Sequence, residues 1–195
     1  MIKKIRFFTK LQIRALLIIL VLIILANLAG FRASFQRERN IQRVLDLGAL
    51  QVGLAKYKGE FGFYPASSSD GKIVACWGPY TDYEKDNDGK RTETAFRKNK
   101  LINLADCEWG KDALLDVMDI NYPAYLSVIP ADPQADKGMS YLYYSNGEDY
   151  QLFASFENKE PGEYSSEIAK RKLNCGKRYC NFGRTSGVPL TEPLK

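Results

Sequence analysis

The apolar positions near the start of the chain form one uninterrupted run. From Ala15 to Ala29 the sequence reads ALLIILVLIILANLA, and with Gly30 and Phe31 the run has 17 residues, close to the roughly 17–25 that span a bilayer. Lipid offers no hydrogen-bond partners to a backbone, so the run is predicted to be α-helical. We predict a transmembrane helix over residues 15–31. Its apolar core comprises Leu16, Leu17, Ile18, Ile19, Leu20, Val21, Leu22, Ile23, Ile24 and Leu25.

The helical pattern continues beyond this run, because no proline occurs between Phe31 and Lys58. One helix is therefore predicted from about Lys10 to Lys58, ended by Gly59, Gly62 and Pro65. Two neighbouring apolar stripes follow its second half, residues 32–58, and both are predicted to pack on a globular domain. The first stripe contains Ile41, Val44, Leu45, Gly48, Val52 and Ala55, and the second contains Leu47, Leu50, Leu54 and Tyr57. The polar side is assigned to Arg37, Arg39, Arg43, Lys56 and Lys58.

Residues 59–195 are predicted to form one head domain with a small antiparallel sheet, which makes the fold α+β. Strands are predicted at residues 73–77, 140–144 and 150–156, and Asn146-Gly147 is a strong hairpin-turn signal. The strand at 150–156 alternates in a way typical of one buried face. Residues 123–133 are predicted to be an extended connection, and short helices are predicted at 111–118 and 166–173. After Asn158 the chain is otherwise predicted to be irregular. The acidic loop that begins at Glu84 is similar to a calcium-binding loop. Its twelfth residue is Ala95, where such a loop has a bidentate Glu, so a turn is predicted instead of a calcium site.

The charge of the chain marks its topology. The net charge is +5, yet residues 1–45 hold nine basic residues and one acidic residue, so the remainder is net acidic. Basic residues before the apolar run predict a cytoplasmic tail over residues 1–14 and an extracytoplasmic head. A cleaved signal peptide is the alternative. Its cleavage site needs two small residues separated by one residue; Ala29 could be one, but Asn27 occupies the position of the other. The basic surplus therefore indicates a membrane, and no nucleic-acid partner is expected.

The four cysteines, Cys76, Cys107, Cys175 and Cys180, lie in the predicted head. Outside the cytoplasm an even set of cysteines usually oxidises, and the pairing of sequence neighbours is favoured among the three connectivities. A zinc site of four thiolates is the alternative, although the spacings do not match its usual pairs. The chain has no histidine, which excludes Ser-His-Asp and Cys-His catalysis. Neither a metal nor another cofactor is expected.

Two stretches of the chain combine motifs in a fixed order. The first is RERNIQRVLDLGALQVGLAKYKGEFGFYP, with Arg43, Asp46-Leu47, Leu50-Gln51, Leu54, Tyr57, Gly62 and Tyr64-Pro65. At these positions it resembles the type IV pilins and the type II secretion pseudopilins, with Gly53 in place of their usual Ala. The second is YLSVIPADPQADKGMSYLYYSNGEDYQLFAS, in which Tyr125-Leu126, Ile129-Pro130, Asp132-Pro133, Tyr144-Ser145, Gly147, Tyr150 and Leu152 match the major pseudopilin. The Cys-containing ending LNCGKRYCNFG is similar to pilins closed by a C-terminal disulfide loop.

The resemblance implies a pilin-like fold and a structural subunit rather than an enzyme. Its partners would be the membrane, other pilin-like subunits in a homo- or hetero-filament, and the assembly machinery. Apolar helices would leave the membrane and bury one another in an open helical assembly. Two features depart from the family: the stretch ENKEPGEYSSEIAKRK beyond the strands lacks the clear Asp-x-Asp pair of the major pseudopilin's calcium loop, and FFTKLQIRALL has neither the Gly nor the Glu of the usual processing motif. The second departure concerns filament entry. That departure motivates an alternative, a membrane-anchored binding domain that does not polymerise. An anchored extracytoplasmic enzyme is a third hypothesis that no motif favours.

Overall fold

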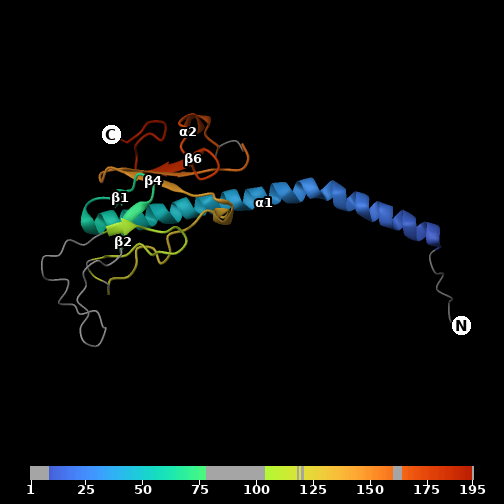
Figure 1. Cartoon of the computed structure of the whole chain (residues 1–195), viewed down its shortest axis with the longest axis horizontal. Coiled ribbons are helices and arrows are strands. Elements are labelled where there is room, and N and C mark those ends of the chain that lie inside the picture. Colours follow the sequence, from blue (N-terminus) through green and yellow to red (C-terminus); the bar gives the residue numbers. More distant parts are fainter. Residues whose placement is uncertain (1–8, 78–103, 118, 120, 160–163, 195) are drawn as a thin grey trace. The chain divides into compact units, whose positions relative to one another are not determined.

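The computed structural model describes residues 9–77, 104–117, 119, 121–159 and 164–194. The acidic loop that begins at Glu84 lies outside these residues. By its internal contacts the chain divides into two units, residues 1–39 and 40–195, and each is described by itself. The fold is α+β, with one long helix and small antiparallel sheets (Figure 1). Two disulfides lie in the head.

The long helix α1 runs from Lys10 to Phe61. It passes through Gly59, where the sequence predicted its end, and stops before Gly62. Gly62 adopts φ +82°, and its N–H donates to the carbonyl of Lys58 at 2.8 Å. This left-handed C-terminal turn is one that glycine forms without steric cost, so the second glycine ends the helix and the first does not. Among the described residues, no helix has an apolar stretch that qualifies as a membrane span.

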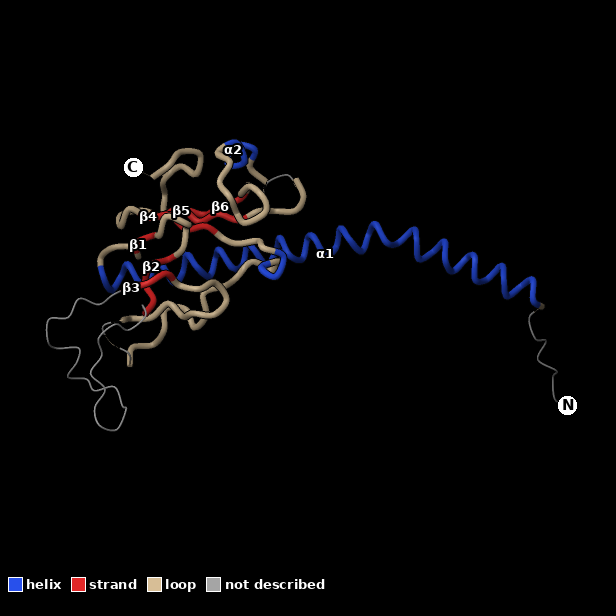
Figure 2. The backbone as a smooth tube through the Cα atoms, viewed as in Figure 1, coloured by secondary structure: helices blue, strands red, loops and turns tan. Residues whose placement is uncertain are grey.

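The described part of the head contains two three-stranded antiparallel sheets (Figure 2). The first has the order β1-β2-β3, formed by Ala66–Ser67, Ile73–Trp77 and Leu104–Asp106, with an irregular register between Val74 and Cys76. The second has the order β4-β5-β6, formed by Leu142–Ser145, Tyr150–Ala154 and Phe182–Thr185. The sequence predicted β2, β4 and β5, and it missed β1, β3 and β6.

The hairpin between β4 and β5 turns at the predicted Asn-Gly pair. Ser145 pairs with Tyr150, and the Asn146 side chain accepts hydrogen bonds from the N–H groups of Glu148 and Asp149. β5 is buried along its whole length, whereas its alternating pattern predicted one buried face. The difference arises because both faces of β5 are covered: Tyr150, Leu152 and Ala154 lie in one buried cluster, and Phe153 lies in the other.

The helix predicted over residues 111–118 is wrong. Leu114 instead forms a β-bridge with Leu126, and its N–H donates to the Leu126 carbonyl at 2.9 Å. Pairing with a distant segment therefore replaces the local helical bonds. The second predicted helix is present but shorter: α2 spans Ser166–Lys170, capped by the Ser165 hydroxyl, and a 3₁₀ turn, η2, covers Ala135–Lys137.

Candidate functional site

One face of α1 forms the centre of the head core. Leu47, Leu50 and Leu54 are fully buried, and Tyr57 is 3% exposed. These four side chains belong to a single apolar cluster with residues of β2, β4 and β5 and of the 114–129 segment. They are the four residues that the sequence assigned to packing between helix and head. Full burial of such side chains contributes about 1.5–3 kcal/mol each.

Gly53 lies on the same face, where the resembling family usually has Ala. A Cβ built at this position would lie 2.5 Å from Cγ of Leu126. Leu126 therefore fills the space that a methyl group would need. The glycine allows Leu126 to approach the helix closely.

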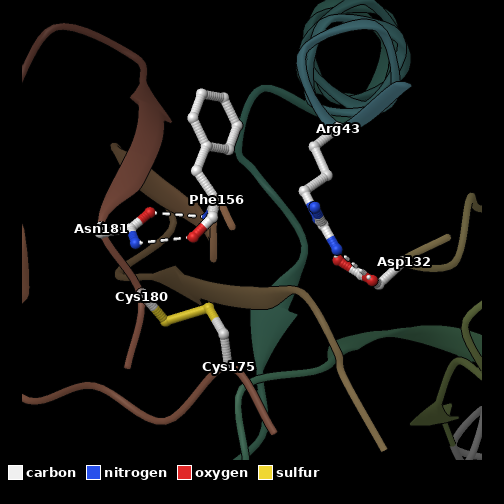
Figure 3. Close-up of a disulfide and its surroundings, with 6 residues drawn as sticks. All are labelled: Arg43, Asp132, Phe156, Cys175, Cys180 and Asn181. Atoms are coloured by element: carbon white, nitrogen blue, oxygen red, sulfur yellow. Dashed lines mark hydrogen bonds and ion pairs between the residues drawn. A yellow bond between two sulfur atoms is a disulfide. The ribbon is translucent and has the colours of Figure 1, made fainter. Parts of the chain in front are cut away.

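A buried polar network joins α1 to the head one turn before these leucines (Figure 3). The Arg43 guanidinium binds Asp132 through two bonds, Nε to Oδ2 at 2.7 Å and Nη2 to Oδ1 at 3.0 Å. Its Nη1 donates to Asn40 at 3.0 Å and to Glu157 at 3.3 Å. Neither the Arg43 nor the Asp132 side chain is exposed to solvent. The bidentate geometry fixes the direction as well as the distance of the approach.

The sequence assigned Arg43 to the polar, solvated side of the helix, and this assignment is wrong. Arg43 precedes Leu47 by four residues and Leu50 by seven, so it continues the buried stripe along the helix. That spacing was the signal that could have located it. Burial alone would lower the pKa of Arg43, but the hydrogen bonds and charges of Asp132 and Glu157 outweigh burial and raise it. The guanidinium therefore remains ionised within the head.

A second buried hydrogen bond joins the helix to the sheet. The Tyr141 hydroxyl donates to Oδ2 of Asp46 at 2.6 Å, and Gln42 donates to the other carboxylate oxygen at 2.7 Å. Burial, followed by this bond to Asp46, raises the pKa of Tyr141. Arg43 and Asp46 thus give α1 two buried polar contacts with the head, beside the leucine contacts.

The opposite face of the same part of α1 is not covered. Ile41, Leu45 and Val52 are 57%, 60% and 56% exposed. The sequence predicted that this stripe also packs on the head; its member Val44 does pack, partly buried, against the core cluster, but the prediction is wrong for the three exposed residues. Gly48 lies between these residues with open space where a Cβ would stand. Because the buried leucines face the core, the 3.6-residue helical period places Ile41, Leu45 and Val52 on the opposite side of α1, which faces solvent.

In the N-terminal unit the apolar residues are likewise exposed. The side chains of Leu16, Leu17, Ile18, Ile19, Leu20, Val21, Leu22, Ile23 and Ile24 are 52–61% exposed. Leu25 belongs to α1, but its side chain, like those of residues 26–29, lies outside those described. This density of exposed aliphatic side chains exceeds what soluble monomers usually present to water.

The cysteines form two disulfides, Cys76 with Cys107 and Cys175 with Cys180, which is the neighbour pairing that the sequence favoured. No free cysteine occurs, so the alternative zinc site has no thiolate ligands. In the described part of the chain, no cluster of three or more potential ligands could hold a metal ion. Cys76 and Cys107 belong to the same apolar cluster as the buried face of α1, whereas Cys175 and Cys180 lie in a second cluster with Leu142, Phe153 and Ile168.

The arrangement amounts to a helix with one face built into a head and its other apolar surface exposed. Such a surface can be buried against lipid or against other helices, and in both cases the interaction is apolar packing. In comparisons with known proteins, no family model, no curated protein and no solved structure matches this chain.

Proposed function

We propose that the chain is a structural subunit of a pilus-like or pseudopilus filament, of the type IV pilus or type II secretion kind, assembled through α1. The observation that carries this proposal is the exposed stripe of Ile41, Leu45 and Val52 on a helix whose other face lies in the head core. A helix needs only one apolar face to hold its own domain. The second face is left for another partner.

The spacing of the stripe suits a neighbouring helix. Its members are four and seven residues apart, so they lie in a row along one side of α1. The small residues Gly48 and Ala49 lie along the same part of α1 and would allow two helices to approach closely. Burial of each large aliphatic side chain on assembly contributes about 1.5–3 kcal/mol before the cost of association. Head-to-tail repetition of such a contact builds an open helical filament.

The N-terminal apolar run would hold the subunit in the membrane before assembly and form the filament core afterwards. The basic residues that precede it favour a cytoplasmic N-terminus and an extracytoplasmic head. The two disulfides of the head agree with an oxidising compartment. On this proposal the partners are the membrane, pilin-like subunits and the assembly machinery. The subunit would need neither an active site nor a cofactor.

The test combines localisation with the state of the N-terminus. Cells that make the protein are fractionated, surface filaments are labelled with immunogold against the head, and the first residue of the filament protein is determined. We expect the label along filaments and a first residue downstream of Met1. Protein that stays in the membrane fraction, with Met1 retained and no labelled filament, would contradict the proposal.

The second candidate is a membrane-anchored binding domain that keeps this fold and does not polymerise. One observation favours it: FFTKLQIRALL carries neither the Gly nor the Glu of the usual processing motif. The same fractionation distinguishes the two candidates, since this second function requires an unprocessed and monomeric membrane protein. An extracytoplasmic enzyme has no comparable observation in its favour.

A further inference from the structure

The basic side chains of the head are concentrated in its last part. Residues 59–163 contain 19 acidic and 10 basic residues, whereas residues 164–195 contain 2 acidic and 7 basic residues. Within residues 170–180, which read KRKLNCGKRYC, five side chains are basic and none is acidic. Such a charge asymmetry within one domain indicates a surface that meets an anionic partner.

Three exposed cations of this stretch have no carboxylate partner in the described part of the chain: Lys172, Lys177 and Arg178. The nearby acidic groups are already balanced. Glu167 is paired with Lys170 at 2.7 Å, and in η2 Asp136 offsets its neighbour Lys137. An anionic partner can therefore reach the three cations without displacing a carboxylate.

The disulfide between Cys175 and Cys180 closes the loop that carries two of these cations (Figure 3). The Cys175 N–H donates to the Arg178 carbonyl at 2.9 Å, and the Cys180 N–H donates to the Leu173 carbonyl at 2.8 Å. Both cysteines are fully buried, whereas residues 176–179 are exposed. The loop therefore presents its cations on a backbone that is ordered before binding, which lowers the entropic cost of an interaction.

The loop lies at the end of the head where α1 enters. Ser140 N–H donates to the Cys175 carbonyl at 3.3 Å, and the next residue, Tyr141, binds Asp46. The β4–β5 turn lies at the opposite end, where Lys58 Nζ donates to one of its carbonyls at 2.7 Å. Residues 46 and 58 are about 18 Å apart along the helix. In a chain anchored through its N-terminal apolar run, the loop thus lies at the end of the head that is nearer to the membrane along the chain.

Tyr179 adds an amphipathic ring to the cations. Its side chain is 53% exposed and directly follows Arg178. Tyrosine is enriched at membrane interfaces, because its ring can enter the apolar boundary while its hydroxyl stays hydrated. A single-stranded nucleic acid instead stacks successive bases on several rings. The other aromatic residues of 164–194, Tyr164 and Phe182, are partly and fully buried, so the loop suits a lipid surface better.

We propose that this disulfide loop binds the anionic headgroups of the membrane in which the chain is anchored. Lys172, Lys177 and Arg178 would contact lipid phosphates, and Tyr179 would lie at the boundary with the acyl chains. The contact would hold the head against the bilayer before assembly. The proposal rests on the anchored topology that both candidate functions share, and it does not depend on polymerisation.

The test measures the acetylation rates of individual lysines by mass spectrometry. The full chain is placed, one copy per disc, in nanodiscs of phosphatidylcholine or of an equal mixture of phosphatidylcholine and phosphatidylglycerol. We expect Lys172 and Lys177 to react at least about threefold more slowly in the anionic discs, and high salt to remove the difference. Lys56, exposed near the other end of the head, should react equally in both. Equal rates for Lys172 and Lys177 in the two discs would overturn the proposal.

A matched pair of substitutions locates the contact. Lys177→Glu should remove the protection of Lys172 in the anionic discs, because it reverses one of the three charges that attract the lipid. Lys56→Glu makes the same change on α1, outside the loop, and should leave that protection unchanged. Both positions are exposed, so neither substitution should unfold the head. Equal protection of Lys172 in the two variants would refute the location.

Two further results would overturn the proposal in distinguishable ways. Protection of Lys172 and Lys177 by single-stranded oligothymidylate in neutral discs, without protection by phosphatidylglycerol, would assign the loop to a nucleic acid. A chain that leaves the discs in alkaline carbonate would contradict the anchor itself, and with it both candidate functions. Unprotected lysines in a chain that stays embedded would contradict the loop contact alone.

Discussion

Two lengths of α1 use the same kinds of side chain in opposite ways. From Ile13 to Ile24 the described aliphatic residues are about half exposed, whereas Leu47, Leu50 and Leu54 in the later length are fully buried. The earlier length is apolar around its circumference. The later one divides into a buried face, with Arg43 and Asp46 beside it, and an exposed stripe. The difference shows that hydrophobicity alone does not tell which apolar residues hold the domain together.

The polar residues mark the distinction. Where the helix belongs to the head, Arg43 and Asp46 have buried partners in Asp132 and Tyr141. Such pairs specify one orientation of the helix, because a rotation about its axis would leave buried charges unpaired. The length from Ala15 to Ile24 contains no charged residue at all. No charged pair therefore fixes the rotation of this length about the helix axis. A helix that moves from lipid to protein neighbours would need this freedom.

The largest expected effect is the loss of the buried ion pair. Arg43→Met leaves the Asp132 carboxylate buried without its cation and should lower the free energy of unfolding of the head by about 3–5 kcal/mol. Lys56→Met, on an exposed position of the same helix, should change it by less than about 0.5 kcal/mol. Urea unfolding followed by tryptophan fluorescence measures both. Equal stability of the two variants would remove the orienting role given to Arg43.

The next effect separates the two faces of the later length. Leu50→Ala should lower the free energy of unfolding by about 2–5 kcal/mol, because it opens a cavity in the core. Leu45→Ala removes the same atoms from an exposed position and should change head stability by less than about 0.5 kcal/mol. Assembly, measured as the filament fraction sheared from cells, should fall in the Leu45 variant. Unchanged assembly with an intact head would count against the exposed stripe as a contact surface.

Alkaline pH tests the burial of Tyr141 together with its hydrogen bond to Asp46. The pKa of Tyr141 is raised in the folded head, and that of Tyr125 is raised to about 12 by burial and then by Asp116. Above pH 10 the unfolded chain loses these protons first, so the free energy of unfolding is steady below pH 10 and falls as pH rises from there. The fall should be about 1.4 kcal/mol per pH unit for each such tyrosine. Tyr141→Phe should make the slope shallower, and an unchanged slope would contradict this origin.

The smallest effect compares two glycines of the later length. Gly48→Ala meets no atom within 4 Å and should raise the free energy of unfolding by about 0.5–1 kcal/mol through helix propensity. Gly53→Ala gains the same propensity but places a Cβ against Leu126, so it should give no gain or a net loss. Thermal unfolding of the two variants side by side decides this. A stabilised Gly53 variant would show that Leu126 moves aside without cost.

Local patterns in the sequence predicted the elements that depend on local signals. The long helix, the β4–β5 hairpin with its Asn146-Gly147 turn, β2 and the start of α2 follow from periodicity, turn chemistry and capping. The four packing residues from Leu47 to Tyr57 were also found by helical spacing. Each of these features is decided within a few residues along the chain.

What the sequence did not predict depends on distant partners. β6 has little pattern of its own and exists because β5 offers an edge, and Leu114 pairs with Leu126 instead of forming a helical turn. The sequence alone predicts a surface position for Arg43, because its buried partner Asp132 lies 89 positions later in the chain. The same limit applied to the two stripes of α1, since only the position of the head shows which stripe is covered.

The central claim is that the exposed stripe of α1 contacts another subunit, and site-specific photo-crosslinking tests it most directly. A photoreactive phenylalanine analogue is placed at Leu45 or at the buried Leu50, and intact cells are irradiated before denaturing electrophoresis. We predict that position 45 gives a ladder of adducts, in steps of one 22.1 kDa subunit or of a pilin-like partner, and that position 50 gives none. Position 45 yielding only monomer and lipid adducts would contradict the account.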